Sequence, residues 1–346
     1  MKFSIGDHKI GKNEKVFIIA EAGSNHNRNL NQAKQLIDIA AEAGADAVKF
    51  QTYSADTLYS KKTPTPEYLD GKMKQDSVWQ LIKDIEMPRE WHKELAEYSQ
   101  SNGLIFMSTA FDHKAVKELE EISVLVHKIA SFEIIDLNLL KEVAQTGKPI
   151  ILSTGMASLG DIEEAINTIR KVNDSDIALL HCSIGYPPPI EELNLRAIKT
   201  LKKAFQLPIG YSDHTMSINI PSVAVSLGAC IIEKHFTIDR SLPGPDHKFA
   251  LEPSELKQMI KNIRETENAL GSYSKTVSKS EKNLYKLARR SLIAKRKIHQ
   301  GETIKPEDII IKRPGYGIPP KFIDIIIGRI ARKDIDKDDI ITWDMI

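Results

Sequence analysis

Two short apolar segments of the sequence end in residues that can do chemistry. Residues 210–214 read Gly-Tyr-Ser-Asp-His, and residues 230–236 read Cys-Ile-Ile-Glu-Lys-His-Phe. Their apolar residues predict short β-strands, and in a strand alternate side chains share a face. Glu233 and His235 therefore point to one face of the second strand, whereas Lys234 points to the other. One histidine from each segment and a carboxylate can then converge.

The expected convergence of His214, His235 and Glu233 describes a site for a divalent metal ion. Neutral imidazoles, a carboxylate and open water positions suit a Lewis acid such as Mn or Mg. Zinc fits less well, because we expect no thiolate nearby to complete a tetrahedral ligand set. The alternative is that both histidines are simply buried and hydrogen bonded.

Length and composition limit the class of protein. The chain has 346 residues, 41% hydrophobic and 27% charged, which allows one large domain and one small domain. A formal net charge of +1 gives no basic surface for nucleic acid or membranes, so local cations must hold any small anionic substrate. The chain has only two cysteines, and it shows neither a signal-peptide pattern nor an apolar run of ~20 residues. We therefore expect a reducing, cytoplasmic location.

Short apolar runs alternate with segments of helical period from Val16 onward, as in βα units with a parallel sheet. Strands are expected at residues 16–21, 47–51, 104–108, 126–129, 149–153, 177–181, 207–212 and 230–236. Helices are expected at residues 31–42, 89–102, 136–146, 160–172, 193–205, 219–227 and 252–270. Eight such units in about 250 residues favour a (β/α)8 TIM barrel. A doubly wound sheet is the alternative, weakened because no Gly-x-Gly-x-x-Gly follows the first strand.

The pattern divides the chain into three parts. We expect a barrel domain over residues 1–270, a polar linker at 271–287 and a small module at 288–346. The small module should contain strands at residues 291–294, 301–304 and 308–311. About 60 residues bury little apolar surface alone, so this module is expected to dock on something. Residues 52–78 are too long for a minimal βα connection and predict either a lid or substrate loop, or a plain surface insertion.

The carboxyl ends of the expected strands carry the polar chemistry, as they do in TIM barrels. They hold Glu21, Lys49, Gln51, Ser108, Thr109, Lys128, Ser131, Ser153, Thr154, Gly155, His181, Ser212, His214, Glu233 and His235. Two lysines with several hydroxyls and a glycine favour a multiply charged anion, most simply phosphate plus carboxylate. Alternatively, Lys128 or Lys49 could form an imine, as in class I aldolases. The histidine pair and the hydroxyls around Lys128 favour anion binding.

Seven motifs occur in order along the chain. They are Glu21-Ala-Gly-Ser-Asn-His-Asn27, Val48-Lys-Phe-Gln-Thr52, Lys128-Ile-Ala-Ser131, Leu152-Ser-Thr-Gly-Met156, Gly210-Tyr-Ser-Asp-His-Thr215, Glu233-Lys-His-Phe-Thr237 and Gly244-Pro-Asp-His247. Together they resemble the sialic-acid synthase family, whose members make nonulosonic acids. Residues 290–346 resemble the family's C-terminal antifreeze-like (SAF) domain, a β-clip fold. The resemblance implies condensation of phosphoenolpyruvate with an N-acylated hexosamine, with release of phosphate, for cell-surface polysaccharide or glycan biosynthesis.

The resemblance also implies how the phosphoenolpyruvate is held. Its phosphate would contact Lys128, Ser131, Ser153 and Ser212. Its carboxylate would contact Lys49 and Thr109. The acceptor sugar would contact Gln51, Tyr186 and Asp246.

The remaining implied roles concern catalysis. Glu21 and Glu233 would transfer protons or position water, without an indication of which is acid and which base. A Mn or Mg ion on His214 and His235 would polarise the aldehyde oxygen of the sugar. The resemblance further implies a homodimer in which the SAF domain crosses between subunits, so that Arg313 of the partner subunit completes the sugar site.

Two features bear on the acceptor sugar. Residues 183–187 read Ser-Ile-Gly-Tyr-Pro where the family usually has Thr-Asn-x-Tyr-Pro, so Ile184 replaces an amide that could contact the acceptor. Residues 242–253 resemble legionaminate-type synthases more than neuraminate or pseudaminate synthases. We therefore expect a legionaminate- or N-acetylneuraminate-type product, with pseudaminate as the alternative. A deoxy-octulosonate or deoxy-heptulosonate phosphate synthase would need a second anion site, and a non-catalytic polysaccharide-binding protein would lack the strand-end residues.

Overall fold

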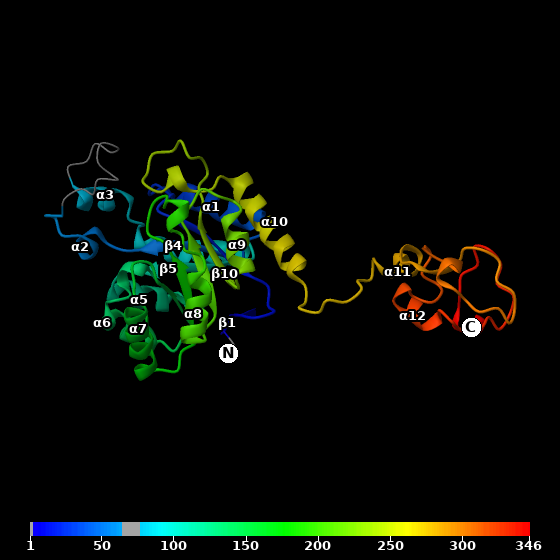
Figure 1. The fold of residues 1–346 in the computed structure, drawn as a ribbon. Coiled ribbons are helices and arrows are strands. Elements are labelled where there is room, and N and C mark those ends of the chain that lie inside the picture. Colours follow the sequence, from blue (N-terminus) through cyan, green and yellow to red (C-terminus); the bar gives the residue numbers. More distant parts are fainter. Residues whose placement is uncertain (1–2, 64–76) are drawn as a thin grey trace. The chain divides into compact units, whose positions relative to one another are not determined.

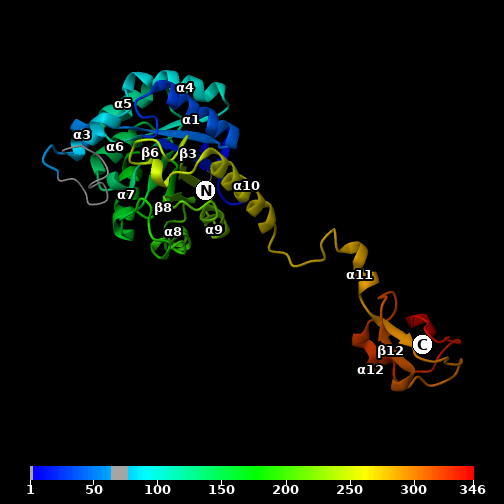
Figure 2. The ribbon, with the colours of Figure 1, turned by 90° about the horizontal axis from the view of Figure 1, so that it is seen from above.

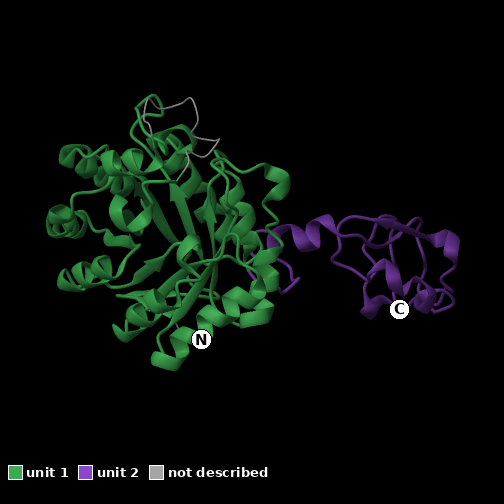
Figure 3. Ribbon diagram, turned by 90° about the vertical axis from the view of Figure 1, so that its left-hand side faces the viewer, with its two compact units in different colours: residues 1–271 green, residues 272–346 purple. Residues whose placement is uncertain are grey.

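The chain folds into two compact units, which are described separately (Figure 3). The computed structural model describes residues 3–63 and 77–346. Unit 1 ends at Gly271, and unit 2 begins at Ser272.

Unit 1 is a closed barrel of eight parallel strands, which confirms the expected TIM barrel (Figures 1 and 2). The order around the barrel is β10-β3-β4-β5-β6-β7-β8-β9, so the last strand closes on the first. The strands are β3 (Phe17–Gly23), β4 (Ala47–Thr52), β5 (Ile105–Ala110), β6 (His127–Ile129), β7 (Ile150–Ser153), β8 (Ile177–Cys182), β9 (Ile209–Asp213) and β10 (Ile231–His235). Each lies within two residues of the bounds that the sequence predicts.

Helices surround the barrel (Figure 2). They are α1 (Leu30–Ala43), α4 (His92–Ser101), α5 (His113–Glu121), α6 (Leu137–Gln145), α7 (Leu159–Val172), α8 (Ala197–Phe205), α9 (Ile220–Ser226) and α10 (Pro253–Leu270). All seven predicted helices are present. The sequence analysis missed α5, whose residues are mostly charged. It forms because Asp112 accepts a hydrogen bond from the N–H of Ala115 at its first turn, and Val116 and Leu119 are buried against the barrel.

The stretch predicted as a lid or a surface insertion contains the short helix α2 (Ala55–Leu58) and leads into α3 (Val78–Ile85). Residues 64–76 of that stretch lie outside the described residues. The described flanks of the stretch line the cavity discussed below, through Leu58, Tyr59 and Val78.

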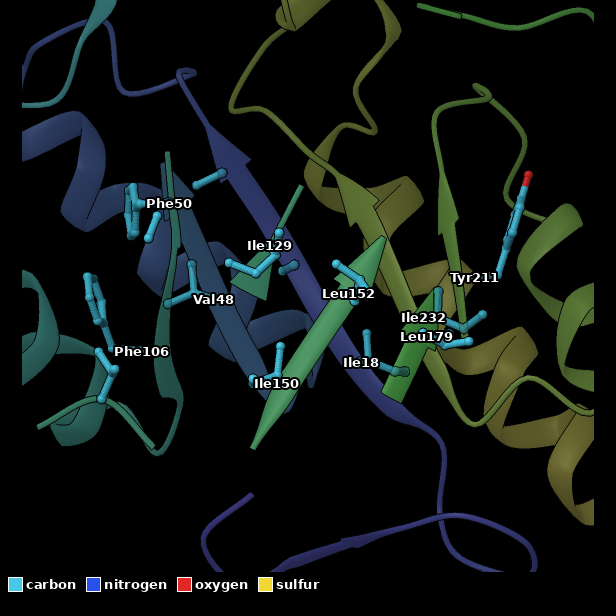
Figure 4. Close-up of a cluster of buried hydrophobic side chains, with 14 of the residues drawn as sticks. Ile18, Val48, Phe50, Phe106, Ile129, Ile150, Leu152, Leu179, Tyr211 and Ile232 are labelled. Carbon is cyan, nitrogen blue, oxygen red and sulfur yellow. The ribbon is translucent and has the colours of Figure 1, made fainter. Parts of the chain in front are cut away.

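Strand side chains alternate between two apolar layers. Outward-facing residues such as Ile18, Val48, Leu152 and Leu179 pack beneath the helices (Figure 4). Inward-facing residues from the first halves of the strands form a second cluster, made of Phe17, Ile19, Ala47, Met107, Val126, Ile151, Ala178, Leu180, Cys230 and Ile231. The next inward-facing position is polar on the other strands and is Cys182 on β8, so one layer of functional groups lies directly above an apolar floor.

An N-terminal hairpin completes that floor. Strands β1 (Phe3–Ile5) and β2 (His8–Ile10) pair antiparallel. Their residues Phe3, Ile5 and Ile10 are buried in the inner cluster, among residues from the amino-terminal halves of the barrel strands. The sequence analysis did not predict this hairpin, because its six strand residues are too few for a clear alternating pattern.

Unit 2 is built around its own apolar core, which includes Leu292, Ile304 and Ile341. Strands β11 (Ser291–Ala294) and β12 (Ile309–Lys312) pair antiparallel. The strand expected at residues 301–304 is instead a single bridge between Thr303 and Ile330. Two further helices, α11 (Lys282–Ala288) and α12 (Ile323–Ile326), belong to this unit, and α11 occupies part of the stretch expected to be linker. Among the described helices, none has the length and apolar character needed to span a membrane.

Candidate active site

A cavity of about 710 Å³ opens at the carboxyl ends of the barrel strands. Every residue to which the family resemblance gives a role lines it except Arg313. The lining set from those predictions is Glu21, Lys49, Gln51, Thr109, Lys128, Ser131, Ser153, Tyr186, Ser212, His214, Glu233, His235 and Asp246. They converge because each lies above the apolar floor, on an inward-facing strand position or on the loop that follows a strand. His181 is different, since it stacks on Tyr211 and bonds to the carbonyl of Leu193.

Two buried lysines and two buried carboxylates form a charge network in this cavity. The Nζ atom of Lys49 lies 2.7 Å from Glu21 and 3.5 Å from Glu233, and it donates to Thr109 Oγ1 at 2.9 Å. The Nζ atom of Lys128 lies 3.9 Å from Glu233 and donates to Ser153 Oγ at 2.7 Å. Cations that are buried and still directed into a cavity can bind an anionic ligand.

The two carboxylates have different environments. Burial raises the pKa of Glu21 to about 7, although Lys49 opposes that change. Burial would also raise the pKa of Glu233, but Lys128, Lys49 and the Ser212 hydroxyl outweigh burial and hold it below its ordinary value. A pair of carboxyl groups whose pKa values are pushed apart is typical of a site that needs one proton donor and one anion.

The lysines also differ. Burial lowers the pKa of Lys128, and the attraction of Glu233 only partly offsets this. For Lys49, burial acts in the same direction, but Glu21 and Glu233 outweigh it and raise the pKa. Lys49 is therefore a permanent cation, whereas Lys128 gains most from an added negative charge nearby.

His214 and His235 lie side by side, with ring centroids 5.3 Å apart. Burial lowers the pKa of His214 to about 4 and the pKa of His235 well below its ordinary value, so both imidazoles are neutral near pH 7. The Nδ1 atom of His214 faces the carbonyl oxygen of Ser183 at 3.3 Å, which leaves Nε2 as the free lone pair. Phe249 packs against both rings.

The histidine pair fits a divalent metal ion on two observations. The Nδ1 atom of His235 is buried without a hydrogen-bond partner, and the nearest carboxylate oxygen, on Asp246, is 3.8 Å away. Both rings present neutral nitrogen, the form that binds metals. Within residues 3–63 and 77–346, no three His, Cys, Asp or Glu side chains form a complete ligand cluster, so water and substrate would supply the other positions.

A thiol lies beside the histidines, contrary to the expectation from sequence. The Sγ atom of Cys182 is 3.7 Å from Nδ1 of His214. Its position at the end of β8, on the inward face, could have been found from strand alternation. Burial raises the pKa of this thiol to about 11, so it is protonated near pH 7 in the metal-free protein.

Hydroxyl and amide groups complete the walls. Ser131 Oγ accepts a hydrogen bond from the N–H of Gly155 at 2.9 Å, and Ser212 Oγ donates to Glu233 at 2.9 Å. A Cβ atom on Gly155 would lie only 2.8 Å from the Ile184 side chain and 2.9 Å from Ser131 Oγ, so this close approach requires glycine. The Gln51 amide donates to Glu21 at 2.8 Å.

The sequence comparisons identify the family. The profile of the NeuB family matches residues 36–275, and the profile of the SAF domain matches residues 289–346. The chain belongs to the NeuB family. The N,N'-diacetyllegionaminic acid synthase of Campylobacter jejuni is 45% identical over 95% of this chain and 99% of that protein. A pseudaminic acid synthase of the same species is 36% identical over 94% and 95% of the two chains.

A solved structure agrees with this assignment. The crystal structure of the N-acetylneuraminic acid (sialic acid) synthetase of Leptospira borgpetersenii matches 82% of this chain and 95% of that chain. The TM-score is 0.75 and the sequence identity is 38%. The expected resemblance to sialic-acid synthases, with a TIM barrel and a SAF domain, is thereby confirmed.

The NeuB barrel also brings residues to the cavity that the sequence analysis missed. They include Ser24, Phe132, Glu133 and Phe249. Burial raises the pKa of Glu133 to about 7, and its Oε2 atom is buried without a hydrogen-bond partner. Glu133 follows β6 by only a few residues, so reading further past each strand end could have found it.

Arg313 belongs to the SAF unit, where its side chain is exposed. Its Nε atom donates to the carbonyl oxygen of Ala288 at 2.7 Å. This contact lies within unit 2 and does not bear on the barrel cavity.

Proposed function

We propose that this chain is a nonulosonic acid synthase that condenses phosphoenolpyruvate with an N-acylated hexosamine and releases phosphate. One observation carries the proposal: two buried lysines, two carboxylates with opposed pKa shifts and a neutral histidine pair share a single cavity. The reaction needs those three things, namely a dianion site, proton transfer and activation of an aldehyde. The names of the relatives in the NeuB family support the same reaction class.

Lys128 and Lys49 are proposed to hold phosphoenolpyruvate. Lys128 with Ser153, Ser131 and Ser212 would bind the phosphate, and Lys49 with Thr109 would bind the carboxylate. The lowered pKa of Lys128 supports this division, because a dianion beside it would restore the charged form. Holding both ends of phosphoenolpyruvate would fix carbon 3 for attack on the aldehyde.

Glu21 is proposed as the proton donor and Glu233 as the ionised partner. Carbon 3 of phosphoenolpyruvate forms a bond to the aldehyde carbon, and the carbonyl oxygen takes up a proton. Water then adds at carbon 2, and the tetrahedral adduct loses phosphate. Glu21, with a pKa of about 7, can carry the first proton, whereas Glu233 stays anionic and can accept a proton from the water.

His214 and His235 are proposed to hold Mn or Mg. When bound, the metal would supply Lewis-acid polarisation of the aldehyde oxygen. The sugar hydroxyls would be oriented around that point by Tyr186, Gln51 and Asp246. The ring centroid of Tyr186 lies 4.7 Å from that of His214.

The acceptor is proposed to be of legionaminate type, with N-acetylneuraminate- and pseudaminate-type acceptors as the alternatives to be compared. The greater identity to the legionaminic acid synthase than to the pseudaminic acid synthase supports this choice. Ile184 lines the cavity against Gly155 and offers an apolar contact where an amide is usual in the family, so it is the position at which the three acceptors should be compared.

We further propose a homodimer in which the SAF unit of one chain acts at the barrel of the other. Residues 272–346 contain 17 Lys and Arg against 10 Asp and Glu, whereas residues 1–271 contain 31 against 37. The two units thus carry opposite net charges, which favours their association between chains. The single cation Arg313 is proposed to reach the sugar site of the partner chain.

An exposed apolar rim around the cavity supports the same arrangement. We define this rim as Phe132, Ile135, Met156, Ile190 and Met216, which lie on the loops after β6, β7, β8 and β9. On the SAF side, Leu284 and Leu287 of α11 and Tyr316 are also exposed. Exposed apolar groups gathered around one opening mark an interaction surface.

The two free, buried cysteines agree with a reducing compartment, and we propose the cytoplasm.

The proposal is tested by phosphate release. Purified protein is mixed with phosphoenolpyruvate and, separately, N-acetylmannosamine, a diacetylated 6-deoxy-mannose and a diacetylated 6-deoxy-altrose, and the product masses are read. We expect sugar-dependent phosphate release that is fastest with the 6-deoxy-mannose derivative and absent in a Lys128→Ala variant. Phosphate release that does not depend on any of the three sugars would overturn the assignment.

A further inference from the structure

The protein contains a buried ion pair on the outer face of the barrel wall, directly behind the histidines. The Nζ atom of Lys234 lies 2.6 Å from Oδ2 of Asp213. Both residues are only 1% exposed. Strand alternation places Lys234 on the opposite face of β10 from Glu233 and His235, so the pair does not line the cavity. The proposed reaction gives it no role.

The register of the two strands gives the pair a special position. Strands β9 and β10 pair in parallel, and the last pair in their ladder is Lys234 with Asp213. The next residue along each strand is a proposed metal ligand, His235 on β10 and His214 after β9. Any shift at this pair therefore moves both imidazoles relative to each other.

Lys234 also holds the loop on the far side of His214. Its ammonium donates to the carbonyl oxygens of Thr215 and Ser217. Asp213 accepts from the N–H of Thr215 at 2.9 Å and from the hydroxyl of Tyr211 at 3.3 Å. One ammonium and one carboxylate thus fix the backbone immediately before and immediately after His214.

The position of the His235 ring depends on that backbone. Metal-binding histidines normally donate their second ring nitrogen to a carboxylate or carbonyl, which fixes the ring. For His214 that partner is the Ser183 carbonyl, whereas no hydrogen bond among the described residues holds Nδ1 of His235, the nitrogen left open to a metal ion. Its ring position follows from β10 and from packing on Phe249. A site of this kind tolerates only small displacements of its ligands.

We propose that Asp213 and Lys234 are positioning residues that set the geometry of the His214 and His235 pair for a divalent metal ion. The inference rests on the proposed function, because it takes the histidine pair as the metal site. Asp213 and Lys234 themselves would touch neither substrate nor metal. Their effect is transmitted through the β9–β10 ladder and the loop at residues 215–217.

The test measures metal binding directly, without turnover. Mn²⁺ is titrated into metal-stripped full-length protein by calorimetry, with folding checked by circular dichroism. The variant Asp213→Asn with Lys234→Met removes both buried charges together, keeps an acceptor for the Thr215 N–H, and removes the donor to the loop carbonyls. We expect its Mn²⁺ dissociation constant to rise roughly 10-fold to 100-fold. At saturating Mn²⁺ its KM for phosphoenolpyruvate should equal that of the wild type.

A matched control changes an ion pair at the other end of the barrel. Arg264 lies 3.1 Å from Asp46, which precedes β4. Asp46→Asn with Arg264→Met makes the same chemical change there, and it should leave the Mn²⁺ dissociation constant unaltered. If the test variant binds Mn²⁺ as tightly as the control and the wild type, the positioning role is wrong and the proposed reaction is unaffected.

Two further outcomes separate the proposals. If the wild type itself does not bind Mn²⁺, the metal site is wrong and the positioning role fails with it. If the double variant does not fold, the test uses three single variants, namely Asp213→Asn, Lys234→Arg and Lys234→Met. Asp213→Asn should weaken Mn²⁺ binding, whereas Lys234→Arg, which keeps a cation and its donors, should bind more tightly than Lys234→Met. Equal binding by the two Lys234 variants would overturn the role.

Discussion

The Nζ atom of Lys49 lies 2.7 Å from Oε2 of Glu21, inside a cavity where both side chains are buried. An anionic substrate that binds Lys49 shares this cation with Glu21. Such sharing weakens the attraction that opposes protonation of Glu21, and the pKa of that carboxyl rises further. Binding of a carboxylate to Lys49 would thus favour the protonated form of Glu21, which is the form that the proposed mechanism needs as proton donor.

Replacing Glu21 by Gln should therefore remove the proton donor with little change of shape. We expect kcat to fall by roughly 10²-fold to 10⁴-fold. Wild-type kcat/KM should decline as pH rises through about 7, the pKa of Glu21 in the free protein, because the donor becomes ionised. The pH profile of kcat/KM checks this, and the decline of kcat should lie at higher pH. A Glu21→Gln enzyme that kept the same decline would show that another group is responsible.

Lys128 should bind an anion and not form an imine. Borohydride added with pyruvate or with phosphoenolpyruvate is expected to leave the intact protein mass unchanged. A stable adduct located on Lys128 would reverse that conclusion. The lowered pKa of Lys128 makes this a demanding test, because a neutral amine is the form that attacks carbonyls.

Metal dependence should follow the histidine pair. Chelation is expected to abolish turnover, and Mn or Mg should restore it in the wild type but not in His214→Ala with His235→Ala. His181→Gln is a suitable control, since His181 also lies near a strand end yet bonds to the Leu193 carbonyl. Full activity of the double variant in metal-free buffer would disprove the assignment.

The crossing of Arg313 between subunits can be decided by complementation. Lys128→Ala and Arg313→Ala proteins should each be inactive, and mixing them under conditions of subunit exchange should restore activity. A mixed dimer then holds one site with wild-type Lys128 from one chain and wild-type Arg313 from the other. Loss of one such contact in the transition state costs roughly a hundredfold in rate. No recovery despite verified exchange would confine Arg313 to its own chain or to no site.

Acid should destabilise the barrel partly through His92. This side chain is buried and bonds to Thr52 Oγ1 at 2.8 Å, and burial lowers its pKa to about 4. Its contribution to the free energy of unfolding is fully present above the ordinary pKa of 6.5 and is lost as pH falls from there through 4. The loss amounts to roughly 3 kcal/mol at most. Urea unfolding at several pH values should show a shallower decline for His92→Gln, whereas parallel curves would refute this cause.

The sequence predicted the barrel well because two signals reinforced each other there. Apolar runs marked the strands, and polar residues such as Lys49 and Lys128 marked their carboxyl ends. The alternation of Glu233, Lys234 and His235 correctly separated cavity residues from the outer face, as their contacts show. Local pattern sufficed where one face of a strand is apolar and its last inward residue is charged.

The features that escaped prediction depend on packing between distant segments. Helix α5 is too charged to show an apolar stripe, and the N-terminal hairpin is too short to show alternation. The proximity of Cys182 to His214 follows only from the neighbouring positions of β8 and β9 in the closed barrel. Pairing of Asp213 with Lys234 likewise requires the register of β9 on β10, which single-strand patterns do not contain.

The hairpin of β1 and β2 has a kinetic consequence. Phe3, Ile5 and Ile10 fill the amino-terminal end of the barrel, so reactants reach the lysines from the opposite mouth. Lys49 and Lys128 lie on the strands, whereas Tyr186 and Asp246 lie on loops beyond the strand ends. A sugar bound to those loops, as proposed above, would obstruct the path to the lysines, so we expect a compulsory order with phosphoenolpyruvate first. A reduced sugar alcohol should then inhibit uncompetitively against phosphoenolpyruvate, and noncompetitive inhibition would mean that the two reactants enter independently.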